Sequence, residues 1–229
     1  MSNLSIFDVA GPIMVGPSSS HTAGACKIGQ FARALFHHTP TKVIFYLHGS
    51  FGEVYKGHAT DRALLGGVMK FRTSDPRIKN SFELAKEKGI KFEFIPKDLG
   101  HHCHPNTVEV LLSNNKDKMS VRGRSVGGGM IEISRINDID VHLKGSAGKR
   151  LSLVVCHEHK KKVIDDVIKK IEALKGVMVA EEVHTKFKDT TITIMGLEGR
   201  RITLPEVLQL EKDCPDVHFI RSLSKLQNQ

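Results

Sequence analysis

The sequence of 229 residues contains no tryptophan, two tyrosines and four cysteines. Because large aromatic side chains are so few, we expect a core built mainly from aliphatic residues. No C-x-x-C pair occurs among the cysteines, so the sequence predicts neither a disulfide framework nor a zinc or cluster motif held by this chain. We therefore expect a reducing, cytoplasmic setting. The cysteines are Cys26, Cys103, Cys156 and Cys214.

Long hydrophobic segments are also missing. The first residues, MSNLSIFDVAGPIM, show no basic leader followed by a long apolar run, so we expect no signal peptide. No stretch of apolar residues approaches the length of a membrane span. We expect no association with a membrane.

Basic residues outnumber acidic ones, with 34 Lys and Arg against 25 Asp and Glu and a net charge of +9. Such an excess is typical of proteins that neutralise nucleic-acid phosphates. The basic residues are spread along the chain, however, and aromatic residues do not alternate with them as a base-stacking surface requires. We expect an ordinary basic soluble protein that binds no nucleic acid. Nucleic-acid binding remains an alternative that rests on net charge alone.

The spacing of apolar residues predicts an α+β fold, with a first α/β layer domain over residues 1–148. Apolar residues recur at helical spacing in 28–36, and shorter helical patterns span about 60–70 and 76–89. Helices followed by a run of strands are typical of such a layer domain. The expected strands are 43–47, 91–95, 107–113, 119–125, 130–136 and 139–143.

A second domain is expected over residues 149–229, after a linker of small residues at 145–148. The pattern there predicts βαββαβ, the ferredoxin-like order, which many unrelated functions share. The expected elements are a strand at 151–156, a helix at 163–174, strands at 177–184 and 190–195, a helix beginning beside Pro205, and a strand at 216–221.

The first segment with chemical potential is GPSSSHTAG at residues 16–24, just before the first expected helix. The unpaired N–H groups of a helix N-terminus bind anions, and hydroxyl side chains there either cap the helix or hold a carboxylate. A serine-rich loop ending in a cap is the simpler interpretation. The polar residues of this segment are Ser18, Ser19, Ser20, His21 and Thr22.

The second segment, KGHATD at residues 56–61, places an amine, an imidazole and a carboxylate before an expected helix. These groups suit proton transfer near neutral pH. The alternative is a polar loop in which Thr60 or Asp61 caps the helix. The polar residues are Lys56, His58, Thr60 and Asp61.

Two further segments follow. Residues 100–107 read GHHCHPNT, a His/Cys cluster dense enough to suggest zinc or copper. Adjacent side chains point in different directions and make a poor tetrahedral site, so we expect instead a polar loop before a strand, with one functional histidine. Residues 125–131 read SVGGGMI, where glycines permit close approach of the backbone to a ligand or simply form a turn. The residues singled out there are Ser125, Gly127, Gly128 and Gly129.

Together these segments resemble the iron–sulfur-dependent L-serine dehydratases. The residues that carry the resemblance are Ile6-Phe7-Asp8, GPSSSHTAG, GSF with YKGHATD at 49–61, HPNT at 104–107 and SVGGGMI, in that family's order and at roughly its spacing over the first two-thirds of the chain. The first domain is also similar to one found in some phosphoglycerate dehydrogenases. Residues 149–229 resemble an ACT domain.

The resemblance implies a beta subunit that acts with a partner alpha subunit to convert L-serine to pyruvate and ammonia. The alpha subunit would carry the 4Fe–4S cluster, and this chain would hold no metal. A homo-oligomer or heterotetramer is expected. Among catalytic candidates, His58 comes first, followed by His21, His104 and Lys56. The implied substrate-binding residues are Ser18, Ser19, Ser20, Thr22, Thr60, Asp61, Asn106, Ser125, Gly127, Gly128 and Gly129.

The chain departs from the family pattern at two places. Ala59 replaces the usual glycine of KGH-G-TD, and the first turn of the ACT-like domain, His157 to Lys162, lacks the Pro and Gly of the amino-acid-binding form. Binding of an effector there is therefore not expected from the pattern, and the domain would serve assembly. A non-catalytic regulatory module that binds an amino acid is the alternative function.

Overall fold

The computed structural model describes residues 13–144 and 151–223, which form two compact units that are considered separately. The fold mixes helices with two β-sheets, as the sequence predicts. The motif Ile6-Phe7-Asp8, the linker 145–148 and the expected domain boundary at 148 lie outside the described residues.

The first unit contains a six-stranded sheet in the order β2-β1-β3-β4-β5-β6. Strand β1 pairs in parallel with β2 and antiparallel with β3, and β3-β4 and β4-β5 are antiparallel. The strands are β1 (Lys42–His48), β2 (Lys91–Pro96), β3 (Thr107–Ser113), β4 (Lys118–Gly127), β5 (Met130–Ile136) and β6 (Ile139–Lys144). The helices are the π-helical turn η1 (Ser19–Gly24), α2 (Ala25–Phe36), α3 (Ser50–Val54), α4 (Thr60–Val68), the 3₁₀ turn η2 (Pro76–Asn80) and α5 (Ser81–Glu87).

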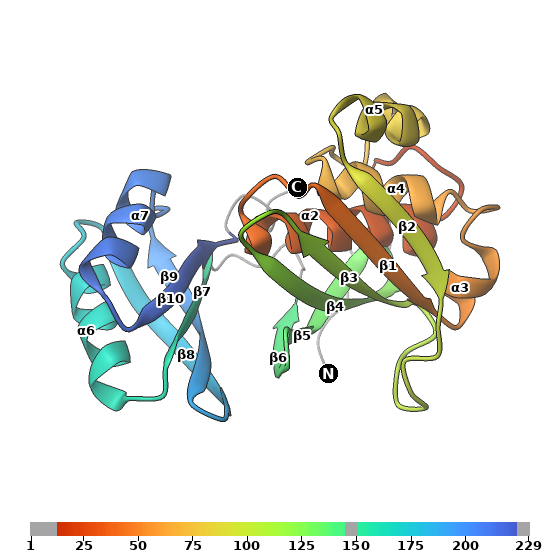
Figure 1. Ribbon diagram of the computed structural model, residues 1–229. Coiled ribbons are helices and arrows are strands. Elements are labelled where there is room, and N and C mark those ends of the chain that lie inside the picture. Colours follow the sequence, from red (N-terminus) through yellow and green to blue (C-terminus); the bar gives the residue numbers. More distant parts are fainter. Residues whose placement is uncertain (1–12, 145–150, 224–229) are drawn as a thin grey trace. The chain divides into compact units, whose positions relative to one another are not determined.

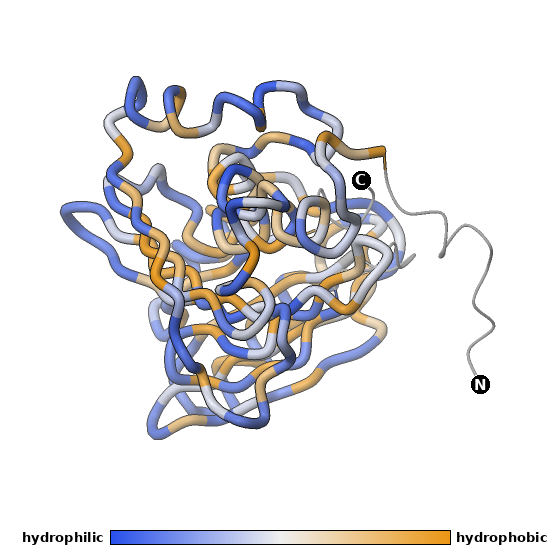
Figure 2. The backbone as a smooth tube through the Cα atoms, turned by 90° about the vertical axis from the view of Figure 1, so that its right-hand side faces the viewer, coloured by the Kyte–Doolittle hydropathy of each residue, from blue (hydrophilic) through white to orange (hydrophobic). Residues whose placement is uncertain are grey.

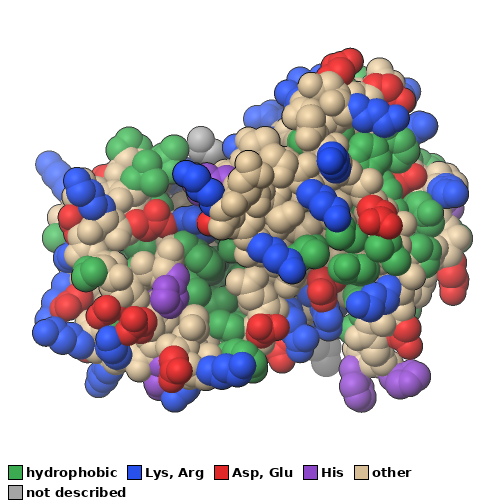
Figure 3. Space-filling view, viewed as in Figure 1, with side chains coloured by type: hydrophobic (Ala, Val, Ile, Leu, Met, Phe, Trp, Pro, Cys, Tyr) green, Lys and Arg blue, Asp and Glu red, His purple; other side chains and the backbone are tan. Residues whose placement is uncertain are grey.

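One face of this sheet is apolar and covered by helices (Figure 1). Alternate residues of β1, such as Val43 and Phe45, are fully buried, as are Val110 on β3 and Val121 on β4. Helix α2 contacts β3, β4 and β5, and α4 packs beside α2. Figure 3 shows hydrophobic and charged side chains mixed on the surface seen there. On β3, Glu109 alternates with buried Val108 and Val110, and it forms an ion pair with Arg122 of β4 at 2.6 Å.

The second unit has a four-stranded antiparallel sheet in the order β10-β7-β9-β8. Its core is aliphatic and lies between this sheet and two helices, with Leu153, Val167 and Ile220 among its buried residues. Figure 2 shows the chain as hydrophobic along many inner segments and hydrophilic at loops. The elements are β7 (Leu151–Glu158), α6 (Lys161–Glu172), β8 (Val177–Phe187), β9 (Thr190–Gly199), α7 (Leu204–Asp213) and β10 (Val217–Ser222), which is the expected βαββαβ order.

The structure corrects three expectations. The single helix expected at 76–89 is split, because Asp75 caps a 3₁₀ turn by accepting from the N–H of Arg77 before α5 begins. Neither Thr60 nor Asp61 caps α4, since its N-cap residue is Ala59. The helical turns η1 and α3 were not expected.

No helix among the described residues combines the length and apolarity that crossing a lipid bilayer requires.

Helices α2 and α4 approach each other backbone to backbone through two glycines. A Cβ atom on Gly67 would lie 2.0 Å from the carbonyl oxygen of Cys26, and one on Gly29 would lie 2.3 Å from that of Leu64. No larger residue fits this crossing without moving a helix. The crossing therefore depends on glycine at both positions.

We expect Gly67→Ala to lower the free energy of unfolding by roughly 2–3 kcal/mol, because overpacking outweighs the intrinsic helix preference of alanine. Chemical denaturation of the purified chain measures the change. Gly57→Ala is the matched control, since its Cβ would meet no atom closer than 3.8 Å. Equal stability of the two variants would contradict the close crossing.

Ala59 adopts the left-handed backbone conformation, with φ 55° and ψ 28°. This conformation strains any residue that has a Cβ atom, by about 1 kcal/mol. We expect Ala59→Gly to raise the free energy of unfolding by up to about 1 kcal/mol. The control Ala34→Gly, within α2, should lower it by about 0.5–1 kcal/mol. Denaturation curves that show a loss of stability in both variants would contradict the assigned strain.

Candidate active site

The serine-rich segment is a helical turn that leads directly into α2. Ser18 caps it, since its hydroxyl accepts from the N–H of His21 at 3.1 Å and its carbonyl accepts from the N–H of Thr22 at 2.8 Å. Ser19 and Ser20 occupy the first turn and are half-buried. The capping interpretation thus holds for Ser18, while the hydroxyls of Ser19 and Ser20 make no hydrogen bond to another described residue.

The imidazole of His21 lies between three side chains. Its Nε2 is 3.0 Å from the hydroxyl oxygen of Ser50, and its ring packs edge-on against Phe51 and His58, with centroid distances of 5.2 and 4.9 Å. Burial lowers the pKa of His21, and the neighbouring His58 lowers it further. Both effects favour the neutral form of the His21 imidazole.

Thr22 joins the first segment to the second. Its buried hydroxyl donates to the carbonyl oxygen of His58 at 3.0 Å. The His58 side chain is exposed, whereas His21 is half-buried. Lys56 is exposed and its Nζ lies 5.7 Å from the ring centroid of Tyr55. The imidazoles of His21 and His58 are thus adjacent but differently exposed. The amine of Lys56 lies two residues before His58 in the sequence.

Thr60 and Asp61 begin α4 and are buried. The hydroxyl of Thr60 has no hydrogen-bond partner among the described residues. A carboxylate oxygen of Asp61 accepts from the N–H of Arg62 at 2.7 Å, and burial raises the pKa of this carboxyl. A buried hydroxyl without a partner costs free energy of folding, so such groups are uncommon. The hydroxyl of Thr60 is one of them and has an unused hydrogen-bonding capacity.

The third and fourth segments meet through their backbones. The carbonyl of Asn106 accepts from the N–H of Ser125 at 3.0 Å, and Nδ1 of His104 accepts from the N–H of Asn106 at 3.1 Å. The Ser125 side chain is fully buried against Gly24, and its hydroxyl also lacks a partner among the described residues. This contact connects the first segment to the fourth.

The glycines of residues 127–129 form the connection between β4 and β5. All three have positive φ, at 102°, 59° and 75°, so the turn requires glycine for its backbone shape. A Cβ atom on Gly127 would meet nothing within 4 Å. The turn interpretation holds, and a role in a cleft stays a prediction.

Two residues of the site were missed by the sequence reasoning, Ser50 and Phe51. Both were visible in the GSF motif but were not assigned a role. Phe51 is fully buried and its N–H donates to the carbonyl of Pro105 at 3.3 Å, which connects the third segment to His21. With these two residues, all four segments are linked by direct contacts.

The described residues do not provide a donor set for an iron–sulfur cluster. The cysteines lie on separate elements, and burial raises the pKa of Cys26 to about 12 and that of Cys156 to about 11. No group of three or more His, Cys, Asp or Glu in residues 13–144 and 151–223 is arranged to hold a metal ion.

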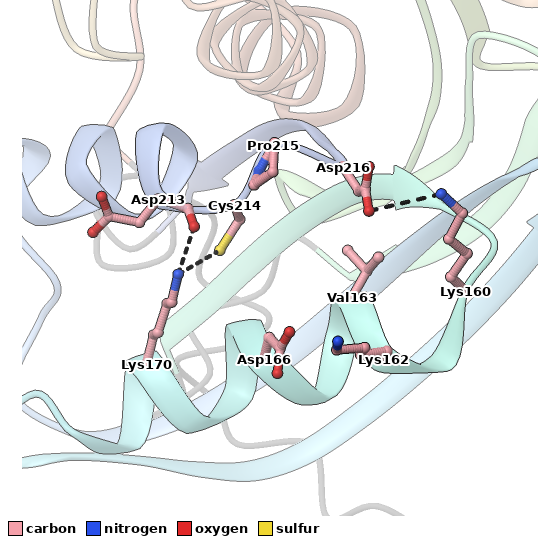
Figure 4. A pocket seen from close by; sticks show the side chains of 9 residues that line it. All are labelled: Lys160, Lys162, Val163, Asp166, Lys170, Asp213, Cys214, Pro215 and Asp216. Carbon is pink, nitrogen blue, oxygen red and sulfur yellow. Dashed lines mark hydrogen bonds and ion pairs between the residues drawn. The ribbon is translucent and has the colours of Figure 1, made fainter.

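A separate hollow lies in the second unit, between α6 and the turn that follows α7 (Figure 4). Two of the lysines that line it already contact the protein: Lys170 donates to the carbonyl of Asp213 at 2.5 Å, and Lys160 pairs with Asp216 at 3.7 Å. None of the residues predicted from the motifs lines it.

Comparisons with known proteins identify the family. The model of the serine dehydratase beta chain family matches residues 5–136. The chain is 45% identical to a probable L-serine dehydratase beta chain of Bacillus subtilis over 68% of this chain and 69% of that protein. It is 49% identical to the L-serine dehydratase beta chain of Peptoniphilus asaccharolyticus over 63% of this chain and 66% of that protein.

A longer relative is matched over about half of its length. The L-serine dehydratase of Helicobacter pylori strain 26695 is 29% identical, over 93% of this chain and 52% of that protein. The match of the family model to more than half of the chain agrees with the four linked segments of the site. This chain belongs to the serine dehydratase beta chain family.

Proposed function

We propose that this chain is the beta subunit of an L-serine dehydratase, a lyase that forms pyruvate and ammonia, and that it acts with an alpha subunit in the cytoplasm. The partner would carry the 4Fe–4S cluster, for which the described residues offer no donor set. The observation that carries the proposal is the pair of imidazoles, His21 and His58, with ring centroids 4.9 Å apart. A heterotetramer with the partner is part of the proposal.

The turn at Ser18–Thr22 is suited to the carboxylate of L-serine. The N–H groups of Ser19 and Ser20 lie at the start of a helical segment that continues through α2, where unpaired donors and partial positive charge favour an anion. Their hydroxyls add further donors. The buried hydroxyls of Thr60 and Ser125 have no partner among the described residues, and opening of the site to substrate would let them bind its remaining polar groups.

Removal of the α-proton requires a base that substrate can reach. The side chain of His58 is exposed, and the pKa of its neighbour His21 is lowered by burial and by His58 itself. When His58 accepts the proton, no second positive charge stands next to it. We assign His58 as the base and His21 as a neutral hydrogen-bonding group. His104 and Lys56 have no contact that assigns them a step.

We propose that the second unit is an ACT domain that serves assembly. Its βαββαβ order supports this interpretation. His157, the next-to-last residue of β7, is buried, and its Nε2 is 2.9 Å from the hydroxyl oxygen of Thr193. The imidazole of His157 therefore already has a partner within the protein, in the segment where an ACT domain of the amino-acid-binding form has Pro and Gly.

We expect His58→Gln to lower the rate of pyruvate formation by at least about 100-fold in the enzyme assembled with its alpha subunit, since a general base contributes about 10²–10⁴-fold. Pyruvate formed from L-serine under anaerobic conditions gives the rate, and gel filtration checks assembly. His38→Gln, at an exposed position after α2, is the control and should keep full activity. Near-normal turnover of His58→Gln would remove His58 from the base role.

We expect Ser125→Ala to raise KM for L-serine about 10-fold, which corresponds to the loss of one hydrogen bond of about 1.4 kcal/mol. Because the hydroxyl has no partner in the described protein, the melting temperature should stay the same or rise. Ser134→Ala, which removes a hydroxyl bonded to the carbonyl of Arg122 on the neighbouring strand, should leave KM unchanged. A fall in stability with unchanged KM would instead assign Ser125 a structural role.

A further inference from the structure

Ser50 is the side chain that contacts the ring nitrogen of His21. Its hydroxyl oxygen lies 3.0 Å from Nε2, a normal distance for a hydrogen bond. Neither the motif analysis nor the family relationship gives this serine a role. It is half-buried and stands at the first position of α3, four residues before that helix ends.

The two sequence neighbours of Ser50, Gly49 and Phe51, both contact Pro105. Gly49, the N-cap residue of α3, has φ 53° and lies so close to Pro105 that a Cβ atom would be 2.9 Å from the Pro105 Cα and carbonyl oxygen. Directly after Ser50, the N–H of Phe51 donates to the same Pro105 carbonyl oxygen at 3.3 Å. The bond to His21 is therefore set by packing of the loop that carries Pro105, not by a mobile side chain on a free loop.

A neutral imidazole carries one ring proton, and the direction of the bond to Ser50 determines which nitrogen holds it. The Ser50 hydroxyl oxygen and Nε2 of His21 are 3.0 Å apart, and a hydroxyl can donate or accept. If the hydroxyl donates to Nε2, the proton must be on Nδ1. Nδ1–H is then a hydrogen-bond donor on a ring that contacts His58 and Phe51.

We propose that Ser50 is a positioning residue for His21, whose hydroxyl donates to Nε2 and thereby fixes the ring proton on Nδ1. For the reaction, this rests on the proposed dehydratase function: removal of the α-proton leaves an electron pair that spreads onto the substrate carboxylate, and Nδ1–H stabilises that charge while His58 takes the proton. A neutral histidine is suited to such a role because it donates without adding a competing base. Ser50 itself contacts neither the α-proton nor any other part of the substrate.

The tautomer is measured on the purified chain by long-range ¹H–¹⁵N correlation spectra of ¹⁵N-histidine-labelled protein. His21 is identified by the signals lost in His21→Gln. In the native chain we expect protonated Nδ1 and unprotonated Nε2. In Ser50→Ala the proton should move to Nε2, and the pKa of His21 should rise, because the donor that stabilises the neutral ring is gone. Ser50→Thr, which keeps the hydroxyl, should restore the native pattern.

Ser134→Ala controls for the loss of a hydroxyl elsewhere in the sheet and should leave the His21 signals unchanged. A proton on Nε2 in the native chain, or the same tautomer in native and Ser50→Ala chains, would overturn the proposal. The native spectrum alone gives this answer if Ser50→Ala does not fold.

In the assembled enzyme, Ser50→Ala should lower kcat roughly 10- to 100-fold, as for loss of an outer partner of a functional histidine. KM should change little, and Ser50→Thr should recover most of kcat. Unchanged kcat together with a shifted tautomer would retain the positioning of His21 but overturn its part in the reaction. Because the spectra need no partner subunit, a failure of the dehydratase assignment would not change them.

Discussion

The backbone contact between α2 and α4 is the constraint on which the site depends. Gly29 and Gly67 bring the two helices so close that their N-terminal ends share one region of the molecule, where Thr22 donates to the carbonyl of His58. The serine-rich turn precedes one helix and KGHATD precedes the other. A helix pair separated by ordinary side chains would be wider by several ångströms, and His21 would not meet His58.

Another consequence of this packing is electrostatic. Two histidines with ring centroids 4.9 Å apart repel each other when both are charged, and burial adds to this effect at His21. His21 is the half-buried one and its pKa is lowered, while His58 is exposed. The same sequence motifs thus place two identical side chains in different surroundings. In the proposed arrangement, Ser50 then sets the tautomer of the neutral ring.

Much of the fold could be predicted from the sequence, because apolar periodicity reports the buried face of each element. The helix at 28–36 and the five later strands of the first sheet follow from it directly. The π-helical turn could not be predicted, since Ser18–Thr22 has no periodic apolar face. The site was partly predictable: the motifs located His21, His58 and Ser125, but the sequence cannot show that Ser50 meets His21 across 29 positions. Nor can it show that two hydroxyls are buried without partners among the described residues.

The central claim is that this chain supplies one part of a site completed by another chain. Anaerobic co-expression with the cognate alpha subunit, followed by assay of pyruvate from L-serine for the pair and for each chain alone, tests it most directly. The account predicts activity in the pair and in neither chain separately. An alpha subunit that is fully active by itself would contradict the account, and would make this chain a regulatory module that binds an amino acid.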